Sequence, residues 1–141
     1  MDRMQRFRIA YFMVVWVVVV ALIVQVSLIG LWLFSGQPTL GIHMEFGHAI
    51  TLMVLGLLIL AFTGRLPRSM RLRTVLLAGL MALQTEVFAF IPGSPLRAFH
   101  SVLPLVIFSL AASLAYSATP FVRGRPKGAT FPLAVAESRA N

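Results

Sequence analysis

Four long apolar runs, separated by short polar segments, divide this chain of 141 residues. Each run approaches the ~20 residues that an α-helix needs to cross a bilayer. We therefore predict an all-α integral membrane protein with transmembrane helices at about 9–34, 44–63, 74–91 and 95–119. The first run is too long for a signal peptide and has no small-residue cleavage site before Pro38, so we expect a retained helix.

The segment after the fourth run differs in composition from the rest. Residues 120–141 are mostly Gly, Pro, Ala and charged residues, with little apolar surface to bury. The sequence thus predicts one four-helix domain, residues 1–119, followed by a flexible basic cytoplasmic tail, residues 120–141.

The basic residues lie almost entirely on one side of the predicted membrane. Lys and Arg near helix ends are retained on the cytoplasmic side of a membrane. Eleven of the twelve fall before the first helix, between the second and third, or after the fourth, and Arg97 alone falls on the other side. Because the loops are short, we predict an up-down-up-down bundle with both termini in the cytoplasm.

Composition supports the membrane assignment and excludes several function classes. The hydrophobic fraction is 59% and the mean hydropathy +0.91, above the ~45–50% apolar fraction of soluble domains. The net charge of +8 does not indicate nucleic-acid binding, since the basic residues occupy only short segments between apolar runs. Absence of cysteine excludes disulfides, thiol catalysis and covalent c-type haem attachment.

The remaining ionisable side chains gather in one zone at the outer side, and such residues in membrane segments are functional candidates. They are His43, Glu45, His48, Glu86, Arg97 and His100. Three of them, His48, Glu86 and His100, lie about five residues inside the outer ends of separate helices, roughly 7 Å deep. Gln25 and Gln84 lie deeper.

His48 and His100 form a candidate pair of metal ligands. Two histidines at equal depth on different helices suit bis-imidazole ligation of haem iron, with the porphyrin between the helices. Gly47 could let the macrocycle approach the backbone, and Arg97 could pair with a propionate. Glu45, on the same helix face as His48, could orient the imidazole, bind a propionate through water or relay protons.

Other polar residues of this zone have open roles. His43 is about 140° around the helix from His48, so both cannot readily hold one iron, and it is expected at the membrane interface or in another role. Glu86, deep in the third helix, could form a buried hydrogen bond or act in catalysis. With Gln84 and His43 it makes a candidate polar or proton site.

The pattern resembles one four-helix half of haem A synthase, an enzyme built from two such units, and it is also similar to a group of small bacterial four-helix membrane proteins. Glu45-Phe46-Gly47-His48 is similar to the Glu-x-x-His element of that family's second helix, and Arg97-Ala98-Phe99-His100 places the other histidine at the fourth. Leu83-Gln84-Thr85-Glu86 resembles its third helix. The resemblance implies a bacterial inner-membrane protein that binds haem b, and a homodimer would rebuild the eight-helix arrangement.

Three function classes follow. The first is a b-type cytochrome that transfers electrons near the outer face, with a quinone or another redox partner, rather than a complete haem A synthase, because one unit is present. The second is a non-catalytic accessory subunit of a larger respiratory or photosynthetic membrane complex. The third is a proton-linked or small-solute carrier that uses Glu86 and Gln84.

Overall fold

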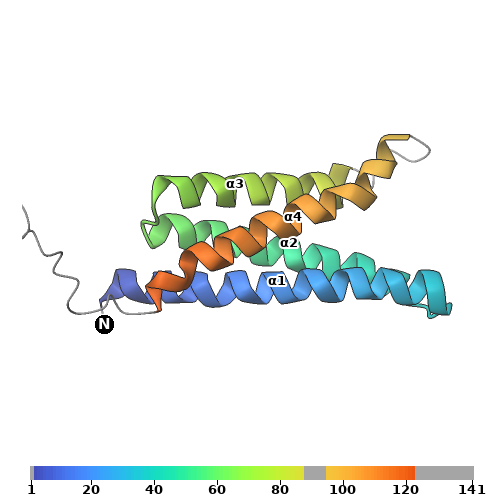
Figure 1. The fold of residues 1–141 in the computed structure, drawn as a ribbon, viewed down its shortest axis with the longest axis horizontal. Coiled ribbons are helices and arrows are strands. Elements are labelled where there is room, and N and C mark those ends of the chain that lie inside the picture. The colour runs from blue at the N-terminus through green and yellow to red at the C-terminus, as the bar shows by residue number, and fades with distance from the viewer. Residues whose placement is uncertain (1, 88–94, 123–141) are drawn as a thin grey trace, which may run out of the picture.

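A computed structural model describes residues 2–87 and 95–122, and within them every regular element is helical (Figure 1). Four α-helices pack side by side, as the apolar runs predict. They are α1 (Arg3–Ser35), α2 (Leu40–Thr63), α3 (Arg68–Ala82) and α4 (Phe99–Ala118). A π-helical turn, η1 (Leu83–Val87), continues α3, and the 3-10 turns η3 (Pro95–Ala98) and η4 (Thr119–Phe121) flank α4.

Three of the four α-helices, α1, α2 and α3, begin earlier than the apolar runs that predict them. α1 begins at Arg3, where the Asp2 side chain accepts a hydrogen bond of 2.7 Å from the backbone N–H of Gln5. α2 and α3 likewise begin at Leu40 and Arg68, four and six residues before the expected starts. Hydropathy locates the part of a helix that suits lipid, whereas capping and backbone hydrogen bonds decide where the helix begins.

The end of α1 depends on a glycine. Gly36 has φ of 63°, in the left-handed region, and its N–H bonds to the carbonyl of Leu31. Glycine adopts this conformation without the steric cost that a Cβ brings. The turn over residues 36–39 then leads the chain back into α2 along α1.

Each helix packs against two others around a common core. α1 contacts α2 and α4, and α3 contacts the same two helices. Large side chains fill the centre, among them Ile50, Leu57, Leu77, Ile107 and Leu114, each almost completely buried. Burying such side chains is the main favourable term in helix packing outside lipid, while inside lipid the close fit itself matters most.

One buried hydrogen bond joins the helices that lie on opposite sides of this core. The Tyr11 hydroxyl of α1 lies 2.7 Å from Thr74 Oγ1 of α3, and both residues are fully buried. Thr74 Oγ1 donates its own proton to the Met70 carbonyl, at 2.9 Å. The Tyr11 hydroxyl is therefore the donor of the bond between the helices.

Within residues 2–87 and 95–122, three helical segments are long and apolar enough to cross a membrane: α1, α2 and the continuous stretch Phe99–Phe121. Large apolar side chains such as Leu52, Ile59 and Leu105 are more than 60% exposed on the bundle surface. This surface suits lipid rather than water. Three of the four predicted crossings are thus confirmed by length and composition. In the third predicted helix, residues 88–91 lie outside the described residues.

The two ends of the bundle differ in chemistry. At one end, here called the basic end, the start of α1 meets the α2–α3 turn and η4: Arg8 Nε donates to the carbonyl of Gly64 at 3.1 Å, and Gln5 Nε2 donates to that of Phe121 at 2.8 Å. Arg73 of α3 donates to the hydroxyls of Ser113 and Ser117 on α4. The opposite end, with the 36–39 turn and the start of α4, is here called the polar end (Figure 1).

Candidate functional site

Four helices contribute polar side chains at the polar end. Gln25 comes from the second half of α1, and His43 and His48 come from the first half of α2. Gln84, Thr85 and Glu86 lie on η1, and His100 lies in the first turn of α4. The predicted ionisable zone therefore coincides in depth with η1, the π-helical turn that interrupts the regular α-helix after α3. Single π-helical turns of this kind are frequent at functional sites.

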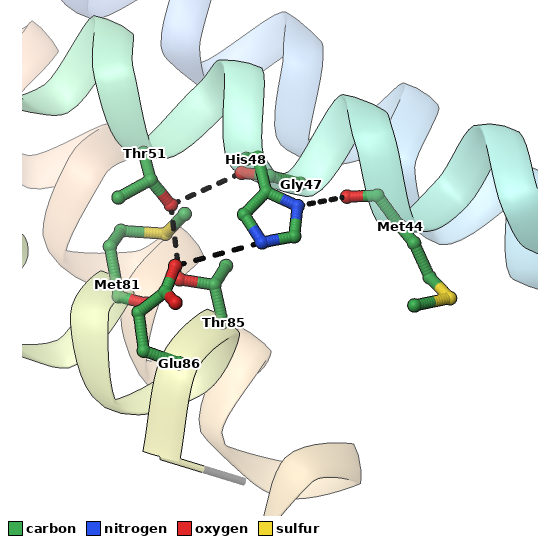
Figure 2. A network of polar contacts seen from close by, with 7 residues as sticks. All are labelled: Met44, Gly47, His48, Thr51, Met81, Thr85 and Glu86. Carbon is green, nitrogen blue, oxygen red and sulfur yellow. Dashed lines mark hydrogen bonds and ion pairs between the residues drawn. The ribbon is translucent and has the colours of Figure 1, made fainter. Parts of the chain in front are cut away.

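His48 bridges α2 and η1 (Figure 2). Its Nδ1 lies 2.9 Å from the carbonyl oxygen of Met44, and its Nε2 lies 3.6 Å from Glu86 Oε1. A carbonyl only accepts, so Nδ1 carries a proton. The His48 and Glu86 side chains are 52% and 51% exposed, and they form an ion pair when the imidazole is protonated on both nitrogens.

Two threonine hydroxyls lie between α2 and η1, next to the His48 and Glu86 pair. Thr51 Oγ1 and Thr85 Oγ1 lie 3.3 Å apart, and each also lies within hydrogen-bond distance of a carbonyl in its own helix, that of Gly47 or Met81 (Figure 2). These contacts tie η1 to α2 one turn below His48. They limit how far Glu86 can move relative to the imidazole.

His43 faces α1 instead of sharing a site with Glu86. Its Nδ1 donates to the backbone carbonyl of Gln25 at 3.0 Å, and Gln25 Nε2 donates to the backbone carbonyl of His43 at 2.8 Å. The His43 Nε2 is 3.5 Å from the same amide nitrogen. His43 is half-buried in this reciprocal contact. The structure therefore separates it from the Glu86 and Gln84 side of the predicted polar site.

Gly47 makes room for that contact. A Cβ at Gly47 would lie 3.0 Å from Gln25 Nε2, tighter than nine in ten real Cβ contacts. The sequence assigns this open backbone to an approaching macrocycle. In the structure the Gln25 amide occupies the space.

Gln84 contacts the backbone of His100. Its Nε2 donates to the His100 carbonyl at 2.9 Å. In a regular helix this carbonyl would accept from the N–H four residues later, which is Pro104, and proline has no N–H. Gln84 therefore supplies the donor that the helix itself lacks.

The other predicted residues have more modest positions. Glu45 is exposed, and both ring nitrogens of His48 contact Met44 and Glu86 instead, so Glu86 is the carboxylate next to that imidazole. The side chain of Arg97 lies outside the described residues, and so does the tail from residue 123. Within residues 2–87 and 95–122, no three His, Asp or Glu side chains form a group that could hold a metal ion.

Gln25 and Thr51 are residues of this site that the sequence does not single out. The sequence marks Gln25 only as a deeper polar position. An amide within an otherwise apolar crossing is itself a signal, because side chains of this type hydrogen-bond across helices in membranes. Its partner, however, cannot be identified from the sequence.

The fold and the polar end together define an α-helical membrane protein with a histidine-containing polar site between its helices. Residues 25–91 match the model of a family of unknown function, DUF6220. The matched segment includes Gln25, His43, His48, Gln84 and Glu86, and it ends before α4. No curated protein and no solved structure matches the chain.

Proposed function

We propose that the protein spans the bacterial cytoplasmic membrane four times as an up-down-up-down bundle with both termini in the cytoplasm. The gathering of Arg8, Arg65 and Arg73 at the basic end supports this orientation, because basic residues mark the cytoplasmic side. The continuous helix through α3 and η1 covers 20 residues, roughly 30 Å, enough for the fourth crossing. The basic end thus faces the cytoplasm and the polar end faces outward.

We propose further that the polar end binds one non-covalent haem b and transfers electrons near the outer face. The observation that carries this proposal is the orientation of the α2 imidazoles. In both His43 and His48, Nδ1 bonds to a backbone carbonyl, so that Nε2 has the lone pair when the ring is neutral. A histidine that ligates a metal has this second contact almost always. His100 of α4 supplies the other imidazole.

The histidine side chains of this site are of the type that ligates a haem iron. Two neutral imidazoles satisfy low-spin haem, and a haem bound there would supply one-electron redox chemistry. The sequence selects His48 as the α2 ligand. Its Nε2 now faces Glu86 Oε1 at 3.6 Å, so ligation through His48 requires the Glu86 carboxylate to turn away.

An optical spectrum of the purified protein tests the proposal. After expression with added haem precursor, we expect a Soret band and the sharp α and β bands of a low-spin bis-imidazole haem on reduction. His100→Ala should abolish this spectrum. A matched variant at the basic end, Gln5→Met, removes a bond between a glutamine and a carbonyl far from the histidines and should leave the spectrum unchanged.

Failure of the wild-type protein to take up haem would overturn the haem proposal. If the chain then co-purified with a larger membrane complex, the accessory-subunit hypothesis would replace it.

A further inference from the structure

Seven arginines and no lysine lie at the basic end, among the residues that the structure describes. The start of α1 and the α2–α3 turn meet at this end of the bundle (Figure 1). Any cation would mark the cytoplasmic side of a membrane. Arginine in addition offers a planar fork that holds two oxygens of one phosphate. The seven are Arg3, Arg6, Arg8, Arg65, Arg68, Arg71 and Arg73.

This positive charge is not balanced by carboxylates of the chain. Of the four acidic residues, Asp2 caps α1, and Glu45 and Glu86 lie at the polar end. The fourth, Glu137, lies outside the described residues. Within residues 2–87 and 95–122 the one ion pair joins His48 to Glu86, so no arginine there has a carboxylate partner. One carboxylate could not balance seven arginines, and the remaining anions have to come from the surroundings.

Two of these arginines are used within the fold. Arg8 Nε donates to the carbonyl of Gly64, and Arg73 donates to serine hydroxyls of α4. The side chains of Arg65, Arg68 and Arg71, in contrast, donate to no acceptor among the described residues. These three, here called the turn arginines, lie in the α2–α3 turn and at the start of α3.

Arg71 differs from the other turn arginines in its surroundings. It is half-buried, whereas Arg65 and Arg68 are exposed. Its guanidinium lies over the ring of Phe62 on α2, 5.5 Å from the centroid, and its Nε is buried without a hydrogen-bond partner. Arg68 stands three positions earlier on the same face of α3, where like charges repel each other. An anion between the two guanidinium groups would remove this repulsion and give both of them an acceptor.

An apolar stripe of α2 leads from this arginine toward the middle of the bundle. Leu55, Ile59 and Phe62 recur at i, i+4 and i+7, so they lie on one face of the helix. Their side chains are 45%, 64% and 51% exposed. A soluble anion would contact only the arginines, whereas a phospholipid would contact both the arginines and the stripe. The position of Arg71 at the end of the stripe therefore favours a lipid.

We propose that the α2–α3 turn binds an anionic phospholipid. Its phosphate lies between Arg68 and Arg71, and one acyl chain follows the apolar stripe of α2. The inference takes its leaflet, the cytoplasmic one, from the proposed orientation of the bundle, and it does not depend on haem. Basic segments at the cytoplasmic surface are attracted to anionic headgroups. Arg65 adds a third positive charge in the turn itself.

Native mass spectrometry of the full chain in a mild detergent tests this proposal. Dioleoyl-phosphatidylglycerol and dioleoyl-phosphatidylcholine have the same acyl chains and differ in net charge. We expect the wild type to bind the anionic lipid with an apparent dissociation constant about tenfold lower, because charged groups form the stronger hydrogen bonds. Equal binding of the two lipids would overturn the proposal. Displacement of the bound lipid by inorganic phosphate would assign the arginines to a soluble anion and would also overturn it.

Variants of the turn locate the site. Arg71→Lys keeps the charge but loses the planar fork, and Arg68→Gln changes an exposed position that the fold does not need. Each should lower the preference for phosphatidylglycerol by about threefold to tenfold. Arg3→Lys is the matched control, because Arg3 also lies over a phenylalanine ring, that of Phe7 at 5.8 Å, but within its own helix. Equal losses in all three variants would show that overall charge binds the lipid, and would contradict the site.

This experiment is independent of the proposed topology. Binding in detergent does not depend on the orientation of the chain in a membrane, so a negative result would overturn the lipid site alone. Thiol labelling that inverted the topology would overturn the assignment of the cytoplasmic leaflet.

Discussion

The Nε2 of Gln84 lies 2.9 Å from the backbone carbonyl oxygen of His100, the oxygen that Pro104 leaves without an intrahelical donor. A side chain on one helix thus completes the hydrogen bonding of the next. Such a contact couples the helices directly at the histidine. It also makes the contributions of Gln84 and Pro104 to stability depend on each other.

The first prediction concerns this dependence. Gln84→Met should lower the free energy of unfolding by about 1–2 kcal/mol, because the His100 carbonyl loses its donor. In a Pro104→Ala background the backbone N–H gained at position 104 can donate to the same carbonyl, so the cost of Gln84→Met should fall by at least half. Unfolding in mixed micelles, analysed as a double-mutant cycle, measures both values. Equal costs in the two backgrounds would contradict the proposed donor role.

The second prediction compares two glycines of α2. Gly47→Ala places a Cβ 3.0 Å from Gln25 Nε2 and should displace the amide, lowering stability by about 1 kcal/mol. Gly56→Ala meets no atom within 4 Å and should be neutral or stabilising by about 0.5–1 kcal/mol, the usual gain of alanine in a helix. Thermal unfolding in detergent separates them. Similar melting temperatures for the two variants would show that the space beside Gly47 is not used.

The third prediction concerns the core bond between Tyr11 and Thr74. Thr74→Val removes the acceptor and leaves the Tyr11 hydroxyl buried without a partner, which should cost about 1–3 kcal/mol. Tyr11→Phe removes only the donor, while Thr74 would keep its bond to the Met70 carbonyl, so the cost should be smaller, about 1 kcal/mol. Unfolding curves of the two variants give the comparison. A larger loss for Tyr11→Phe would reverse the assigned direction of the bond.

The fourth prediction concerns orientation in the membrane. The chain has no cysteine, so a single introduced thiol reports on its own position. Ser35→Cys at the end of α1 should react with a membrane-impermeant maleimide in intact spheroplasts. Ser69→Cys near the start of α3 should react only after the membrane is opened. The opposite pattern would invert the proposed topology.

Part of this fold could be predicted from the sequence. The lengths of the apolar runs determine the number of helices, since each must satisfy its backbone within a span of about 20 residues. The starts of α1, α2 and α3 could not be read in the same way. The start of α1 depends on the Asp2 cap, and those of α2 and α3 depend on backbone hydrogen bonds to Thr39 and Pro67 ahead of the apolar part of each helix.

The candidate site, too, could be predicted from the sequence only in part. Depth counting from helix ends brings His48 and Glu86 to one level, and the structure places them 3.6 Å apart. It could not choose Glu86 over Glu45 as the carboxylate next to His48. Both carboxylates are within reach of that imidazole on a schematic bundle, and the rotation of α2 about its axis decides between them.

By itself, then, the sequence determined the solvent of this protein, the number of its helices and the segregation of its charges, because these depend on composition and on spacing along one chain. Only the tertiary structure decided that Gln25 and Gln84 form equivalent bonds to His43 and His100. Those bonds join residues on different helices, through a carbonyl opened by Gly47 in one case and by Pro104 in the other. Their existence depends on the rotation and offset of packed helices, which no single helix encodes.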